Sequence, residues 1–307
     1  MMKADDLRLD LSSLALHDGD TAELVRAARK LAEPHGFTVG VQVHNTASAM
    51  DLERMAGLGV PLSFHTPILS EYVMNLAAAD NAPAFAVAEE QMAFMRRYKV
   101  DRAVFHGFRM TDLPIPAFGN GRSYDYCMKP ANRPELARRE GSRFVCDFTA
   151  DPEFLMRRDR VKANLALLRK RYPAITWCVE NDFPAYGSGN LRGSDLAYLE
   201  HPVCLDTGHL WASAKMLGFD FYREMQIALD SGHVRMIHFH ASRYTFDMDH
   251  EDWGDGHLPL DHPTAISLAR VAQACRAAGV GHYVLEIPTA TLRDVETFLR
   301  LYLRAGA

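Results

Sequence analysis

Seven acidic or imidazole side chains follow directly on short apolar runs spread over most of the chain. They are His44 after Val-Gln-Val, His65 after Leu-Ser-Phe, His106 after Ala-Val-Phe, Glu180 after Trp-Cys-Val, Asp206 after Val-Cys-Leu, His238 after Met-Ile and Glu286 after Val-Leu. Imidazoles and carboxylates are ligands of zinc and similar divalent ions. A buried, isolated carboxylate is unfavourable, so these acids require cations nearby. The pattern predicts a metal cluster, provided that the fold brings the ends of the runs together.

A single histidine or aspartate at the end of a strand is more often a helix cap or a satisfied core residue than a metal ligand. Seven such residues at equivalent positions are harder to explain in that way. Three short patterns extend the series: Asp206-Thr-Gly-His209, His238-Phe-His240 and Asp255-Gly-His257. Because side chains alternate along a strand, His238 and His240 lie on one face. We expect His238 to be a ligand and His240 to face the substrate or to support a ligand.

Short strands that alternate with helices must position these residues. Eight apolar runs are interpreted as strands: 7–11, 38–43, 61–64, 102–105, 175–179, 202–205, 234–239 and 282–285. Helix signals lie between them, such as Asp151-Pro152 at one start, and Pro263 and Gly279 at the two ends of the seventh helix. Eight strand–helix units predict an α/β fold, a single (β/α)8 TIM barrel over residues 1–307. The carboxyl ends of its strands meet at one catalytic mouth.

One connection is much longer than a strand and a helix require. Residues 107–150 follow the fourth strand and are predicted to form a long loop insertion at the catalytic face. They carry seven basic residues against five acidic ones. Loops of this length in a compact domain are usually functional or disordered. A lid over the site and a structural excursion are both open interpretations of this insertion.

The composition limits the class of protein. The 307 residues are 48% hydrophobic and carry a net charge of −5, which excludes a disordered or collagen-like chain and argues against binding nucleic acid through charge alone. No apolar stretch reaches the roughly 20 residues of a membrane span, and no signal-peptide pattern is present. Five scattered cysteines form no C-x-x-C pair. We expect a cytoplasmic protein without a membrane partner; the oligomeric state is not indicated.

These residues together resemble the xylose-isomerase-like TIM barrels, and within them endonuclease IV, the metal-dependent apurinic/apyrimidinic (AP) endonucleases of family 2. The resemblance spans roughly residues 38–290 and rests on these motifs: Ser-Phe-His65-Thr-Pro, Asn75-Leu-Ala, Val-Phe-His106-Gly, Val-Glu180-Asn-Asp, Leu-Asp206-Thr-Gly-His209, Ile-His238-Phe-His, Asp255-Gly-His257-Leu-Pro and Val-Leu-Glu286. Each of the nine ligand positions of that family carries the expected residue type.

The resemblance implies two to three divalent ions, with zinc favoured over Mn, Fe or Mg. The three ligand sets would be His65, His106 and Glu180; Glu180, Asp206, His238 and Glu286; and His209, Asp255 and His257. Clustered ions lower the pKa of a shared water and stabilise phosphate oxygens. A phosphoester is then the expected substrate, with abasic DNA as the family example and DNA repair as the family role. The residues expected to act in catalysis are Glu180, Glu286 and His209.

A second interpretation keeps the fold and changes the chemistry. The chain also resembles sugar or keto-acid isomerases and epimerases of the same superfamily, in which one Mn or Mg ion would be held by Glu180, Asp206, His238 and Glu286. Glu180 and Glu286 would then move a proton beside the carbonyl of a small sugar, while His209 and Arg243 contact hydroxyls. Under either interpretation, the expected substrate-binding residues are His44, Asn45, His240, Arg243 and Trp253.

Overall fold

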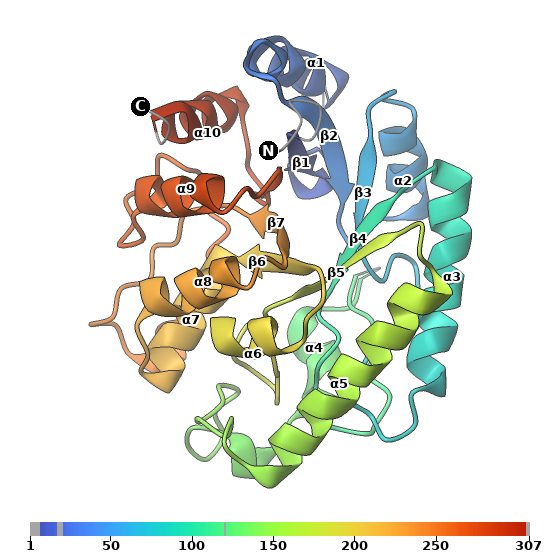
Figure 1. The fold of residues 1–307 in the computed structure, drawn as a ribbon, viewed down its shortest axis with the longest axis vertical. Coiled ribbons are helices and arrows are strands. Elements are labelled where there is room, and N and C mark those ends of the chain that lie inside the picture. Colours follow the sequence, from blue (N-terminus) through green and yellow to red (C-terminus); the bar gives the residue numbers. More distant parts are fainter. Residues whose placement is uncertain (1–6, 17–20, 120, 305–307) are drawn as a thin grey trace.

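Eight parallel strands form a closed barrel in the computed structural model, which describes residues 7–16, 21–119 and 121–304 (Figure 1). The strands are β1 Arg8–Ser12, β2 Thr38–Val43, β3 Leu62–His65, β4 Arg102–Phe105, β5 Thr176–Glu180, β6 Val203–Asp206, β7 Val234–His238 and β8 His282–Leu285. Each strand pairs with the next, and β1 also pairs with β8. The predicted (β/α)8 barrel is confirmed, and every predicted strand end is within one residue of the observed one.

Helices surround the barrel. They are α1 Thr21–Ala32, α2 Ala49–Ala56, α3 Ala82–Tyr98, α4 Tyr124–Met128, α5 Pro152–Arg171, α6 Gly193–Tyr198, α7 Thr207–Leu217, α8 Phe221–Asp230, α9 Leu268–Ala277 and α10 Leu292–Arg304. Short 3-10 turns cover Ser13–Ala15, Glu33–His35, Lys129–Ala131, Pro134–Leu136 and His250–Asp252. The first and last helices, α1 and α10, pack against each other and complete the ring (Figure 1). Within the described ranges, none of the helices has the length and apolar character to cross a membrane.

The helix predicted to open at Pro263 begins later. Helix α9 starts at Leu268, where the Ser267 side chain accepts a hydrogen bond from the Arg270 backbone N–H. Before it, the Thr264 hydroxyl accepts hydrogen bonds from the backbone N–H groups of Ser242 and Ile266. These bonds tie the preceding residues to the loop after β7, so the predicted start was wrong by five residues. The side chain of a cap, and not the proline, sets this helix boundary.

Alternation along the strands positions the predicted ligands. Five interior side chains form an apolar cluster separate from the main core, which we call the barrel plug: Val104, Cys178, Cys204, Met236 and Val284. Two residues after each of them comes a predicted ligand: His106, Glu180, Asp206, His238 and Glu286. Since alternate side chains of a strand share a face, these ligands lie one layer above the plug, at the carboxyl end of the barrel.

A buried charge network fills the opposite end of the barrel. The Asp10 carboxylate on β1 accepts hydrogen bonds from Arg8 Nε at 2.6 Å and from the Ser63 hydroxyl at 2.6 Å, and His282 Nε2 lies 3.0 Å away. Gly40 on β2 is paired with Asp10, and a Cβ there would overlap the carboxylate. Burial opposes ionisation, but Arg8 and His282 hold the pKa of Asp10 well below its usual range. This network is a structural element at the non-catalytic face.

Candidate metal centre

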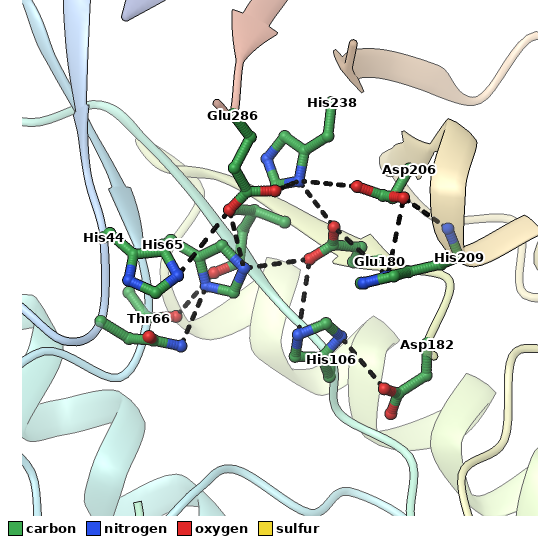
Figure 2. Close-up of polar contacts among 12 residues, drawn as sticks. His44, His65, Thr66, His106, Glu180, Asp182, Asp206, His209, His238 and Glu286 are labelled. Carbon is green, nitrogen blue, oxygen red and sulfur yellow. Dashed lines mark hydrogen bonds and ion pairs between the residues drawn. The ribbon is translucent and has the colours of Figure 1, made fainter. Parts of the chain in front are cut away.

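Glu180 lies at the centre of the predicted cluster, at the end of β5 and fully buried (Figure 2). Its Oε2 is 3.2 Å from His65 Nε2 and 3.7 Å from His106 Nε2. Its Oε1 is 2.7 Å from His238 Nδ1. Three ring nitrogens thus face one carboxylate from three different strand ends. This arrangement fits a carboxylate that bridges two cations.

The first predicted ligand set converges. The side-chain ligand atoms of His65, His106 and Glu180 all lie within 4.8 Å of one another. The His65 ring is contacted on its other side by the buried Asn45, whose Nδ2 is 3.4 Å from His65 Nδ1. The Nε2 of His65 is therefore the nitrogen that faces Glu180. Asn45, predicted to bind substrate, instead supports this ring.

The second set gathers around His238 on β7. Its Nδ1 lies 2.8 Å from Glu286 Oε2 and 3.7 Å from Asp206 Oδ2, in addition to the contact with Glu180 (Figure 2). Burial alone would lower the pKa of His238, but the acids around it raise that pKa well above its ordinary value. Burial likewise opposes ionisation of Glu286, yet His238 and His257 lower its pKa to about 2. The carboxylates of this set are therefore ionised and require positive charge.

The third set lies beside the other two and also converges. His209 Nε2 is 2.8 Å from Asp255 Oδ2, and His257 Nε2 is 2.9 Å from Asp255 Oδ1. His209 belongs to the first turn of α7, whose start is capped by Asp206: its side chain accepts the His209 backbone N–H at 2.6 Å. His209 Nδ1 donates to the Asn181 carbonyl at 3.0 Å. That bond leaves Nε2 directed at Asp255, the orientation a ligand needs.

Unsatisfied buried atoms show that this donor set fits cations. Among the described residues, both oxygens of Glu180, both ring nitrogens of His238, His106 Nδ1 and His257 Nε2 are buried without a hydrogen bond of regular geometry, although some lie close to an oppositely charged group. Buried polar atoms normally have partners, so several such atoms at one place indicate that a further group belongs there. Imidazole and carboxylate ligands at this spacing suit zinc-type divalent ions.

A cavity of about 260 Å³ opens above the three sets. Eight titratable residues of the site line it: His44, His65, His106, Asp182, His209, Asp255, His257 and Glu286. The remaining wall is Phe118, Tyr124, Arg143 and Phe183, and the first three of these belong to the segment 107–150. That segment therefore reaches over the carboxyl end of the barrel and contributes one basic and two aromatic side chains to the wall.

Comparisons with known proteins show the fold. No family model matches the sequence, and no curated protein matches it. A solved D-tagatose 3-epimerase-like protein is similar with a TM-score of 0.59 at 13% identity, over 97% of this chain and 99% of that one. The TTHB071 protein from Thermus thermophilus, soaked with ZnCl₂, has a TM-score of 0.52 at 15% identity, over 97% and 98%. An AP endonuclease, family 2, from Brucella melitensis has a TM-score of 0.52 at 13% identity, over 97% of this chain and 98% of that one. The chain has the same (β/α)8 barrel fold as these structures.

Of the predicted substrate-binding residues, some line the cavity of the barrel and others do not. His44 lines the cavity, with Nε2 3.8 Å from Glu286 Oε1. His240 is fully buried and does not line it; its Nδ1 accepts the His257 backbone N–H at 3.0 Å, and its Nε2 lies 3.2 Å from Asp206 Oδ2. His240 therefore contacts two predicted ligands, Asp206 and His257, and its contact with substrate stays a prediction.

Arg243 and Trp253 are also outside the cavity wall. Arg243 is exposed and lies over the Tyr244 ring. Trp253 is buried and stacks on the same tyrosine, at 5.4 Å between ring centroids. Neither side chain lines the cavity. That Arg243 and Trp253 bind substrate stays a prediction.

The sequence patterns also missed a residue, Asp182. Its Oδ1 lies 3.6 Å from His106 Nδ1, on the side of the ring opposite Glu180 (Figure 2). The buried Arg109, from the segment 107–150, donates to Asp182 at 2.8 Å and to the Ala185 carbonyl at 2.7 Å. Arg109 thus fixes the acid that faces the back of a predicted ligand ring. The spacing of two residues from Glu180 is the signal that could have identified Asp182.

Replacing Asp182 by asparagine is expected to weaken binding of one divalent ion by about 10- to 100-fold, since a carboxylate behind a histidine ligand orients the ring and raises its basicity. Competition between the metal-free protein and a chromophoric chelator for zinc measures this affinity. Asp147→Asn is a matched control, because Asp147 pairs with Arg192 outside the cavity wall. Equal zinc affinity of the Asp182 variant and the control would show that His106 is positioned without Asp182.

Proposed function

We propose that the protein is a divalent-metal-dependent phosphoester hydrolase that uses two to three ions, most suitably zinc. The observation that carries this proposal is the third set. The groups of His209, Asp255 and His257 converge beside the sets that share Glu180. A single-metal isomerase does not require this additional set. A hydrolase that binds both the attacking and the leaving oxygens at separate ions does.

The proposed roles follow from the contacts. His65, His106 and Glu180 would hold one ion, Glu180, Asp206, His238 and Glu286 a second, and His209, Asp255 and His257 a third. Ions held there would supply Lewis-acid stabilisation of phosphate oxygens and acidify a water. The residues of the chain orient these groups. Glu180 belongs to both of the first two sets. Asn181 and Asn45 contact the rings of His209 and His65, and the Asp182 carboxylate lies 3.6 Å from His106 Nδ1.

One observation favours a second candidate, a single-metal isomerase or epimerase. Glu180 and Glu286 approach the same nitrogen of His238, at 2.7 and 2.8 Å. Two carboxylates that share one position could move a proton at the carbon beside a carbonyl. The similar structures include a D-tagatose 3-epimerase-like protein. Arg243, whose contact with sugar hydroxyls this candidate would use, does not line the cavity.

Metal content separates the two candidates. The protein reconstituted with zinc and freed of excess metal is expected to contain two to three ions per chain by elemental analysis. The Asp255→Asn variant is expected to contain about one ion fewer, because Asp255 contacts both histidines of the third set. A single ion per chain, unaffected by that substitution, would contradict the hydrolase and support the isomerase.

The activity assay follows from the metal content. The metal-loaded protein is incubated with small phosphate esters, with a duplex that contains an abasic site, and with a panel of ketoses. Release of phosphate or strand cleavage supports the hydrolase, and interconversion of ketoses supports the isomerase. The His106→Gln variant distinguishes them further, because His106 belongs only to the multi-metal arrangement. A large loss of activity in this variant is expected for the hydrolase and a modest one for the isomerase.

A further inference from the structure

We infer that the substrate is a small phosphorylated molecule enclosed in the cavity, and not duplex DNA, with Arg143 contacting the part of the substrate distant from the metal ligands. This inference rests on the proposed hydrolase function and adds the class of substrate. Three independent features of the described residues support it: the shape of the wall, the pairing of basic residues around the mouth, and the charge of the centre.

The cavity wall limits the size of the substrate. Its volume of about 260 Å³ lies below the range of about 300–1,000 Å³ usual for sites of drug-sized ligands. Aromatic rings stand directly beside the site histidines: Phe118 is 6.4 Å from His44 and Phe183 is 6.0 Å from His209, centroid to centroid. Both rings therefore form part of the wall beside these histidines. A compact molecule such as a sugar phosphate matches this space.

The basic residues of the segment 107–150 do not form a track for a phosphate backbone. Apart from Arg143, three of the seven are paired with carboxylates: Arg109 with Asp182, Arg133 with Glu153 and Arg139 with Glu251. Proteins that bind a duplex gain affinity from basic side chains that neutralise several successive phosphates. Paired side chains offer little of that gain. The chain's net charge of −5 also disfavours a polyanionic duplex.

The summed charge of the candidate ligands and their ions favours a substrate with two negative charges. Four carboxylates belong to the three ligand sets: Glu180, Asp206, Asp255 and Glu286. Asp182 is already balanced by Arg109. Two divalent ions would neutralise the four acids, and a third would leave two positive charges. A phosphate monoester carries about −1.5 to −2 near neutral pH and would balance them.

Arg143 is the single basic side chain, apart from the histidines, among the described residues that line the cavity. Its Nη1 is 3.0 Å from Asp125 Oδ1, and its Nη2 donates to the Trp253 carbonyl at 3.2 Å. It therefore joins the segment 107–150 to the loop after β7 across the mouth. A planar guanidinium with five donors can keep these two contacts and still donate to a hydroxyl or a phosphate oxygen inside.

Calorimetric titration of the zinc-loaded protein tests the inference. Ribose 5-phosphate, inorganic phosphate and a duplex with a stable abasic analogue serve as probes. Ribose 5-phosphate is expected to bind, and Arg143→Ala to weaken it about 10-fold or more while changing phosphate affinity less. Arg139→Ala, which removes the same charge from an exposed pair with Glu251 outside the wall, is the control and should bind like the wild type.

Each outcome has a defined meaning. Tight binding or cleavage of the abasic duplex would overturn the inference while supporting the hydrolase. Unchanged ribose 5-phosphate affinity in the Arg143→Ala variant would also overturn it. Binding of ribose 5-phosphate that depends on Arg143, without hydrolysis of any phosphate ester, would support the substrate class and contradict the proposed hydrolase.

Discussion

The Glu180→Gln variant is expected to lose on the order of 10³-fold or more in kcat/KM, because its side chain is the meeting point of the site. Ring nitrogens of His65, His106 and His238 lie 3.2, 3.7 and 2.7 Å from its oxygens. An amide has nearly the same shape but replaces an anionic oxygen by an N–H donor. The variant should therefore fold and lose bound metal together with activity.

The measurement is kcat/KM on the substrate that the assays above identify, together with metal content. Circular dichroism verifies the fold of the variant. Glu200→Gln is a suitable control, since Glu200 pairs with Lys162 at an exposed position away from the cavity. The loss is expected for a hydrolase and for an isomerase alike. An active Glu180→Gln enzyme with full metal content would show that the centre lies elsewhere.

The Asp10→Asn variant is expected to be destabilised by about 3–5 kcal/mol, the usual cost of removing one partner from a buried ion pair. Asp10 is completely buried, and the variant leaves Arg8 buried without its counter-ion. The Asp10 carboxylate already fills the space that a Cβ at Gly40 would take, so the surroundings leave little room for a compensating shift. Urea unfolding at pH 7 gives the difference in the free energy of unfolding.

The pH dependence provides an internal control for this prediction. Folding lowers the pKa of Asp10 below its ordinary value of 3.8, so the contribution of its charge is present above about pH 4 and is lost as the pH falls further. The stability difference between wild type and variant should therefore be constant near neutrality and shrink in strong acid. A difference that is small at pH 7, or that does not shrink in acid, would contradict a charge-based role for Asp10.

The fold could be predicted from the sequence because the relevant signals are local. Apolar runs of four to six residues and the helix signals between them depend on neighbours in the chain, and the closed barrel follows from their number and order. The start of α9 could not be predicted in this way. Residues 263–267 are drawn away from the helix by the hydrogen bond from the Ser242 backbone N–H to the Thr264 hydroxyl, a contact across 22 positions, and the Ser267 cap then starts the helix.

The convergence of the candidate ligands was also predictable, since position along a strand determines which face a side chain takes. The residues missed or misplaced come from long loops. Asp182 faces His106 because Arg109, 73 positions earlier, holds it there. Phe118, Tyr124 and Arg143 reach the cavity through the path of the segment 107–150. Arg243 and Trp253 contact Tyr244 and do not line the cavity. Such paths depend on tertiary contacts without a periodic sequence signal.

The barrel plug separates two groups of charged residues in the barrel interior. Val104, Cys178, Cys204, Met236 and Val284 form a layer of low polarity between the Asp10 network and the candidate metal centre. One barrel therefore holds a buried ion pair, Arg8 with Asp10, at one end and an open cavity beside the candidate ligands at the other. Substitutions at the cavity can therefore change the chemistry of the site while the Asp10 network continues to stabilise the fold.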